Sequence, residues 1–227
     1  MQQAALNLIA IGIFGTTMSI LLGPMLNISP AIPALTTVGI LSIATLDTLS
    51  FQGKGVTVLL DWVAGFSPGH RDRIIRHEAG HFLVAYLLGI PITGYTLTAW
   101  EALKNGQPGL GGVIFDTEKL SPNVLAPLEM QLTLERFCTV WMAGIAAENL
   151  AYGNVEGGGE DRHKLREALS LWGRQEAEFV QKERWATRQA ETIIGDNKDS
   201  YEALVEAMKQ RTSVAECFQI IKLNCQK

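Results

Sequence analysis

The sequence predicts a mainly helical α+β protein, with a transmembrane helical hairpin at the N-terminus and then a helical domain that carries a small β-ribbon. Three observations predict this fold. The first 46 of the 227 residues carry no charged side chain. Most of the remaining chain has apolar residues at helical spacing. One segment, residues 92–99, is instead rich in β-branched and aromatic residues with partial alternation, which is typical of a strand.

The uncharged N-terminus contains two apolar runs, residues 4–25 and 31–49. Each approaches the ~20 residues that a helix needs to cross a bilayer. Because a polar turn with Pro30 separates them, we expect a hairpin with both ends on one side of the membrane. A single span is the alternative, since Pro33 and Gly39 weaken the second run. A cleaved signal peptide fits less well because the first run lacks a basic beginning.

The hairpin should end near residue 53, and residues 54–227 should form the second domain. Residues 56–66 contain one charge and Trp62, so they could lie along the membrane surface or form a buried element of the domain. Four basic residues follow the second run: Lys54, Arg71, Arg73 and Arg76. By the positive-inside rule they favour a domain that faces the cytoplasm or an equivalent compartment. The arginines that begin the next helix are expected on a solvated face.

Residues 77–81 read H-E-A-G-H inside a helical pattern that runs from residue 70 to residue 88. Positions i and i+4 lie on one helix face, so His77 and His81 can bind one metal ion together. Glu78 lies next to them and can act as a general base toward water. Zinc bound by such a pair lowers the pKa of a coordinated water to about 7 and polarises a carbonyl, as peptide hydrolysis requires.

Chance could produce this short string, but its surroundings argue for a zinc site. The chain has four histidines, and two of them lie here. The helix is otherwise apolar, and buried polar groups need a partner or a ligand. A catalytic zinc needs a third protein ligand, for which Asp161 and His163 are candidates. By spacing alone, Asp161 is explained equally well as an acidic residue that favours a helix N-terminus.

Two further motifs follow in order: residues 144–148 read G-I-A-A-E, and residues 157–161 read G-G-G-E-D. With H-E-A-G-H they resemble the peptidase domain of the FtsH family of membrane-bound zinc proteases, from about residue 70 to the C-terminal helices. The resemblance implies that Asp161 is the third zinc ligand, with His163 as its rival. Glu148 is either a partner that orients a ligating histidine or a buried carboxylate with a structural role.

The same resemblance implies a polypeptide substrate and a bacterial plasma membrane or thylakoid membrane as the location. It also implies self-association or association with FtsH-type ATPase proteases. However, the sequence contains no G-x-x-x-x-G-K-[ST] motif, so we expect no ATPase on this chain and no ATP-driven unfolding of substrates. The net charge of −4 gives no reason to expect nucleic-acid binding. Three cysteines without a C-x-x-C pattern predict no disulfide framework.

The rest of the chain predicts one β-ribbon and several helices. Residues 92–99 and 113–115 should pair across an insertion, residues 100–108, and a glycine-rich turn at 109–112. The ribbon either offers an edge to an extended substrate or is a structural hairpin. Helices are expected at three places: residues 128–152, from residue 161 to a break at 196–199, and residues 201–221.

We therefore expect a membrane-anchored, ATP-independent zinc metalloendopeptidase that acts on unfolded or membrane-proximal polypeptides. His77, His81 and Asp161 would bind zinc, and Glu78 would be catalytic. The alternative is a non-proteolytic adaptor or regulatory subunit of a membrane protease complex, with a structural zinc site. Glu78 favours the enzyme, because a structural site needs no general base.

Overall fold

The computed structural model describes residues 2–51, 54–65, 67–106, 111–116 and 127–225. They are mainly helical with a small two-stranded sheet, as the sequence predicts. The chain divides into two compact units, Met1–Arg71 with Thr98–Gly111 and Asp72–Leu97 with Gly112–Lys227. This division does not coincide with the expected boundary after residue 53, which itself lies outside the described residues, as do positions 109 and 110 of the expected glycine turn.

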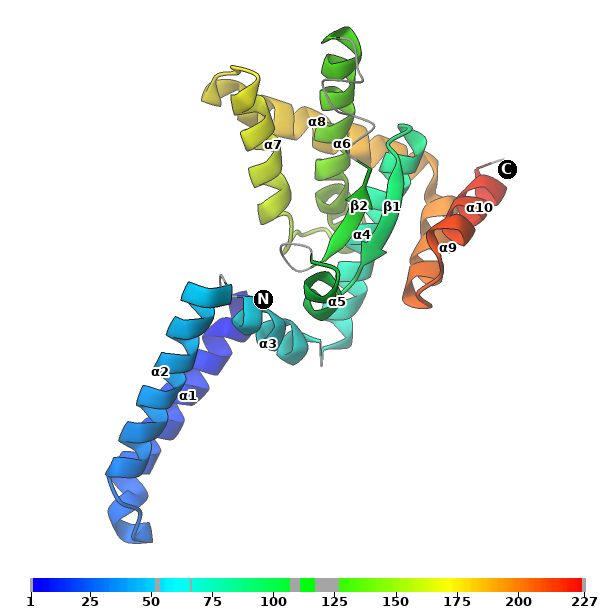
Figure 1. The fold of residues 1–227 in the computed structure, drawn as a ribbon. Coiled ribbons are helices and arrows are strands. Elements are labelled where there is room, and N and C mark those ends of the chain that lie inside the picture. The colour runs from blue at the N-terminus through cyan, green and yellow to red at the C-terminus, as the bar shows by residue number, and fades with distance from the viewer. Residues whose placement is uncertain (1, 52–53, 66, 107–110, 117–126, 226–227) are drawn as a thin grey trace. The chain divides into compact units, whose positions relative to one another are not determined.

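The first unit begins with two antiparallel apolar helices, α1 (Gln2–Leu22) and α2 (Ala31–Phe51) (Figure 1). A short 3₁₀ helix, Gly23–Leu26, and a left-handed Asn27 reverse the chain between them. The stretches Ile9–Leu26 and Ala31–Ser50 are long and apolar enough to cross a membrane, and few of their residues are buried. A core helix of a soluble protein would instead be mostly buried. The helical hairpin is confirmed, and its insertion in a bilayer stays a prediction.

Two shorter helices, α3 and α5, also belong to the first unit. Helix α3 (Lys54–Ala64) begins where Asp47 of α2 accepts hydrogen bonds of 2.9 Å from the backbone of both Gly55 and Val56. Helix α5 (Ala99–Lys104) lies at the start of the expected insertion, and Thr98 caps its N-terminus. Positions 107 and 108 of that insertion lie outside the described residues.

The second unit is a helical bundle with the β-ribbon at its side. Its first helix, α4 (Pro68–Leu87), starts in the last residues of the first unit and agrees closely with the expected helix. The other helices follow in chain order: α6 (Pro127–Tyr152), α7 (Gly159–Leu171), α8 (Glu176–Asp196), α9 (Lys198–Lys209) and α10 (Val214–Asn224).

The expected single helix over residues 201–221 was wrong. The chain breaks between α9 and α10, where Arg211 adopts a left-handed φ of 60°. Ser213 then starts α10 with a capping box: its side chain accepts from the Glu216 backbone, and Glu216 bonds back to the Ser213 backbone. Local capping therefore overrides the continuous helical pattern.

Helix α4 is the centre of the main hydrophobic core. Phe82 and Leu83 are fully buried among apolar residues of α6, α9 and α10. A Cβ on Gly80 would lie 2.6 Å from the Ala143 carbonyl oxygen of α6, so only glycine allows these two backbones to approach so closely. This contact sets α4 against the segment of α6 that carries the G-I-A-A-E residues.

The β-ribbon pairs β1 (Ile92–Thr96) antiparallel with β2 (Gly112–Phe115). Gly94 lies opposite Ile114, and the register is irregular beside it at Thr93. The ribbon packs on the main core, where Tyr95 meets the Phe82 ring edge-on at 6.1 Å between ring centroids. β1 ends at residue 96 and not at the expected residue 99, because residues 98–99 already form the start of α5.

Candidate metal centre

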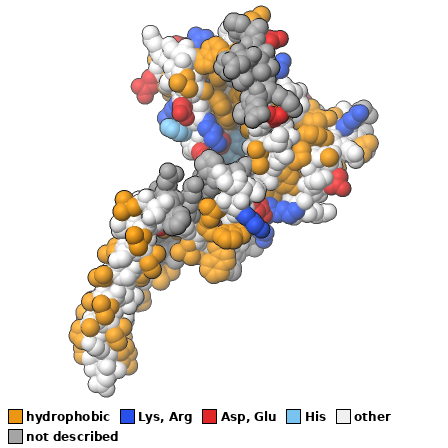
Figure 2. All heavy atoms as spheres, viewed as in Figure 1, with side chains coloured by type: hydrophobic (Ala, Val, Ile, Leu, Met, Phe, Trp, Pro, Cys, Tyr) orange, Lys and Arg blue, Asp and Glu red, His pale blue; other side chains and the backbone are white. Residues whose placement is uncertain are grey.

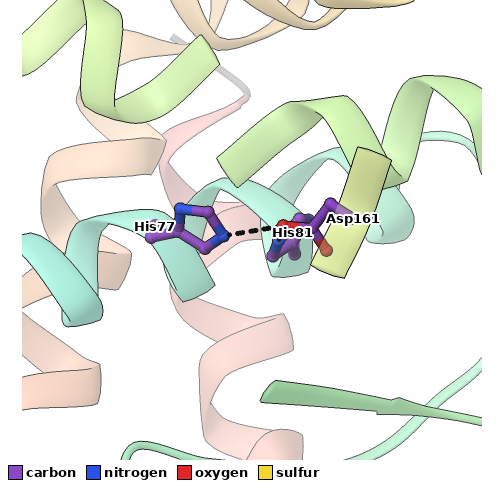
Figure 3. A group of neighbouring side chains, drawn as sticks. All are labelled: His77, His81 and Asp161. Atoms are coloured by element: carbon purple, nitrogen blue, oxygen red, sulfur yellow. Dashed lines mark hydrogen bonds and ion pairs between the residues drawn. The ribbon is translucent and has the colours of Figure 1, made fainter. Parts of the chain in front are cut away.

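His77 and His81 lie one turn apart on the buried face of α4, as their spacing predicts (Figure 3). Their rings meet edge-on with centroids 4.7 Å apart, and the two residues are 9% and 5% exposed. The imidazoles therefore face the interior of the second unit, in the direction of α7.

Asp161 completes the group from the first turn of α7. Its Oδ2 lies 3.1 Å from His77 Nε2 and 3.5 Å from His81 Nε2. One donor atom from each of the three residues falls within 4.8 Å of the other two, and all three residues are buried. Two imidazoles and a carboxylate at this separation could hold a metal ion.

The other ring nitrogens are already bonded, which determines the direction in which each imidazole offers a lone pair. His81 Nδ1 lies 2.7 Å from the Val140 carbonyl oxygen, which can only accept, so Nδ1 carries the proton. His77 Nδ1 lies 2.8 Å from Glu148 Oε1. The Nε2 atoms of both histidines therefore face Asp161. Metal-ligating histidines typically have such a second partner on the opposite ring nitrogen.

Glu148, on α6, bonds to several groups around the triad. Besides His77, its carboxylate accepts hydrogen bonds from Arg73 Nη1 at 2.8 Å and from the backbone of Glu156 and Gly157. Burial raises the pKa of Glu148, but these donors outweigh it and hold the pKa at about 2. Of the two roles left open by the sequence, this geometry matches the one that orients a ligating histidine. The same carboxylate also holds the loop that leads to Asp161.

Arg73 does not lie on the solvated face that the sequence predicts for it. Its side chain is 13% exposed rather than solvated, and it also bonds to Asn154 and stacks 4.2 Å above the Tyr152 ring. The expectation of a solvated face was wrong for Arg76 too, which bonds to Asp72 and Glu202. The available signal was spacing, because Arg73 precedes His77 by four residues and so shares its helix face.

The rival ligand His163 is exposed and lies outside the group of converging donors. Two residues along α7 rotate a side chain by more than half a turn, so His163 and Asp161 cannot face the same point. The geometry therefore supports Asp161 as the third donor.

Glu78 lies beside the donors without belonging to them. Its Oε2 is buried and, among the described residues, has no hydrogen-bond partner. Burial raises the pKa of Glu78, while the neighbouring His81 and His77 lower it to a smaller extent. A Cβ on Gly112 would lie 3.6 Å from Glu78 Oε2, so the carboxylate faces the first residue of β2.

Gly144, the first residue of the second motif, makes room for the site. A Cβ there would lie 2.3 Å from His77 Nε2, closer than any side chain allows. The glycine is therefore needed by the donor geometry itself, because any larger residue would displace the imidazole from Asp161.

The charges of the site fit a divalent cation. Electrostatics in the absence of a metal already show the mutual attraction of the donors. Burial lowers the pKa of His77, but hydrogen bonds to Asp161 and Glu148 outweigh it and raise the value. Three carboxylates, those of Glu78, Glu148 and Asp161, lie at or beside the donors and favour a cation there. Two histidines with one carboxylate is a donor set that zinc uses.

Comparison with known proteins adds no further information: no family model matches the chain, and no curated protein matches its sequence. The resemblance to FtsH-type peptidases thus depends on the three motifs alone. What the structure shows is a buried His77, His81 and Asp161 group that could hold a metal ion.

Proposed function

We propose that this protein is a membrane-anchored zinc metallopeptidase that cuts unfolded or membrane-proximal polypeptides without ATP. The proposal joins the apolar hairpin, the three donors and the resemblance of their motifs to the FtsH peptidase. Zinc held by the donors would supply a water of lowered pKa and would polarise the scissile carbonyl.

The observation that carries the proposal is the carboxylate of Glu78. Its Oε2 is buried beside the donors and has no hydrogen-bond partner among the described residues. Leaving a buried carboxylate oxygen unpaired costs free energy, so its retention needs a reason. A general base that must take a proton from water provides that reason.

Each residue then has a defined role. His77, His81 and Asp161 hold the metal, and Glu148 and Arg73 orient His77 through hydrogen bonds of 2.8 Å each. Glu78 takes the proton of the attacking water and passes it to the leaving amine. The raised pKa of Glu78, caused by burial, makes it a stronger base than an exposed glutamate.

The test is cleavage of an unfolded fluorescent casein by the purified full chain in detergent, with zinc and without ATP. The Glu78→Gln variant should lose at least about 100-fold in rate, the lower end of the usual contribution of a general base, and still bind zinc. The matched control is Glu160→Gln, which removes an exposed carboxylate next to Asp161. It should cleave like the native chain.

Two outcomes would contradict the proposal. If the native chain binds zinc but cleaves nothing, the alternative of a non-proteolytic adaptor or regulatory subunit replaces the peptidase proposal. If Glu78→Gln cleaves as fast as the native chain, the activity belongs to another group or to a contaminant.

A further inference from the structure

Helix α3 of the first unit exposes three large apolar side chains among its described residues. Val56, Leu59 and Trp62 recur every three residues, and their exposed fractions are 39%, 52% and 64%. Val58, Leu60 and Val63, by contrast, are half-buried within the same unit. A helix that packs one side on its own protein normally exposes polar residues on the other side. Helix α3 therefore has a second apolar side that the described residues of its own unit do not cover.

Helix α5 repeats this arrangement and is fastened to α3. The Ala99 backbone donates a 2.9 Å hydrogen bond to Asp61 Oδ2 on α3, while Ala99 and Ala102 are buried. The opposite side of α5 exposes Trp100 at 61% and Leu103 at 37%. Both helices of this unit outside the hairpin thus expose tryptophan together with aliphatic side chains.

These faces continue directly from the hairpin. Asp47, near the end of α2, caps the start of α3, so α3 begins where the second apolar helix ends. Figure 2 shows hydrophobic side chains along the hairpin and over α3. Tryptophan is enriched at the boundary between lipid acyl chains and headgroups, where its large amphipathic ring sits at headgroup depth.

We propose that α3 and α5 form a docking surface for the lipid of the same bilayer that the hairpin enters, with Trp62 and Trp100 at headgroup depth. This inference rests on the membrane-anchor part of the proposed function but not on proteolysis. It assigns a role to α5. This helix belongs to the first unit, although the strands that precede and follow it in the chain, β1 and β2, belong to the second unit.

The test measures the depth of single tryptophans in full-length protein reconstituted into phosphatidylcholine vesicles. Lipids brominated near the headgroup or deep in the acyl chain quench nearby tryptophan fluorescence. Variants that keep Trp62 or Trp100 as the sole tryptophan, with phenylalanine at the other four positions, should lose most fluorescence to the shallow bromines. The matched control keeps only Trp172, which is 43% exposed in the second unit and should lose little to either lipid.

A Phe14→Trp reporter in the tryptophan-free background separates the two ideas. Phe14 lies in the first apolar stretch, so its replacement should be quenched by the deep bromines. Deep quenching there, with Trp62 and Trp100 no more quenched than Trp172, would overturn the docking surface and leave the anchor intact. No quenching at any of these positions would overturn the anchor and the docking surface together. The casein assay reads the peptidase activity separately.

A second measurement applies if the loss of tryptophans unfolds the protein, as judged by circular dichroism. In the otherwise native sequence, Leu103→Cys with Cys225→Ser carries a nitroxide on α5, since Cys138 and Cys217 are buried. Greater accessibility of the nitroxide to oxygen than to an aqueous nickel complex supports docking on lipid. The reverse order overturns it.

Discussion

Two polar clusters meet helix α4, and they differ in burial. The donor cluster consists of Arg73, His77, His81, Glu148 and Asp161. The surface network consists of Asp72, Arg76, Tyr152, Glu202 and Lys209. In each, an arginine of α4 bonds to a glutamate of another helix, Arg73 to Glu148 at 2.8 Å and Arg76 to Glu202 at 2.9 Å. The Glu148 side chain is 2% exposed, whereas that of Glu202 is 44% exposed.

Because of this difference in burial, we expect one cluster on α4 to serve metal binding and the other to contribute mainly to stability. Exposed ion pairs contribute little because water competes for both partners. Buried carboxylates are instead usually bonded, and removing one partner of a buried pair leaves a charge in a nonpolar interior. We therefore expect changes in the donor cluster to act on the metal, and changes in the surface network to act on stability by small, pH-dependent amounts.

The largest effect is expected for Asp161→Asn. The change keeps the size of the side chain but removes the negative charge that faces both Nε2 atoms at 3.1 and 3.5 Å. Loss of a residue that only orients a ligand lowers metal affinity by ~10–100-fold. Loss of the ligand Asp161 itself should lower zinc affinity by at least as much. Competition with a chromogenic chelator measures it. His163→Ala, which removes the exposed rival ligand, should leave the affinity unchanged; a loss there instead would transfer the ligand role to His163.

A matched pair of glutamate variants compares the two clusters directly. Glu148→Gln removes the charge between His77 and Arg73, and zinc affinity should fall about 10–100-fold. Glu202→Gln removes the equivalent partner of Arg76 and should not alter zinc affinity. Equal effects of the two changes on the chelator titration would show that burial does not separate the clusters.

The sequence predicted the parts of the site that local spacing determines. His77 and His81 share a face because a helix repeats every 3.6 residues, and the helix itself follows from Pro68, Gly89 and the apolar pattern between them. The role of Asp161 as third donor could not be predicted from spacing alone. The order of the three motifs predicted it, and in the structure its carboxylate lies beside both histidines.

Other parts depend on contacts that leave no signature in the sequence. The partner of His81 Nδ1 is a backbone carbonyl, Val140, and any residue could supply it. The spacing of Arg73 from His77 indicates a shared helix face, but it does not identify the partner of Arg73, Glu148, which is 75 positions away in the chain. Helix α5 was not predicted because it is short. It is stabilised by its N-cap Thr98 and by Asp61 of α3, which lies 38 positions away in the chain.

Glycine replacements test how tightly the donor cluster is packed. In Gly144→Ala the new Cβ would lie 2.3 Å from His77 Nε2, so we expect the free energy of unfolding to fall by about 1–3 kcal/mol, with weaker zinc binding. Gly195→Ala on α8 meets no atom within 4 Å and should gain about 0.5–1 kcal/mol. Thermal unfolding followed by circular dichroism measures both. A neutral Gly144→Ala would mean that α6 can move away from His77.

The smallest effect is expected in the surface network, for Asp72→Asn. Burial raises the pKa of Asp72, but hydrogen bonds from Tyr152, Lys209 and Arg76 outweigh it and lower the pKa from 3.8 to about 2. A carboxyl whose pKa is lower in the folded state stabilises the fold above its unfolded pKa, here 3.8. That contribution is lost as the pH falls through about 2.

Because the Asp72 side chain is 33% exposed, solvent screening reduces its contribution to about 1 kcal/mol. The variant should therefore unfold about 2–4 °C lower than the native chain at pH 7. The difference should shrink between pH 4 and pH 2, where the native carboxyl becomes protonated and the variant has nothing to lose. The exposed Glu167→Gln serves as the control and should unfold with the native chain at pH 7. If the difference in unfolding temperature between Asp72→Asn and the native chain stays constant down to pH 2, the lost stability is due to side-chain packing and not to charge. The contrast between the two clusters would then not be electrostatic.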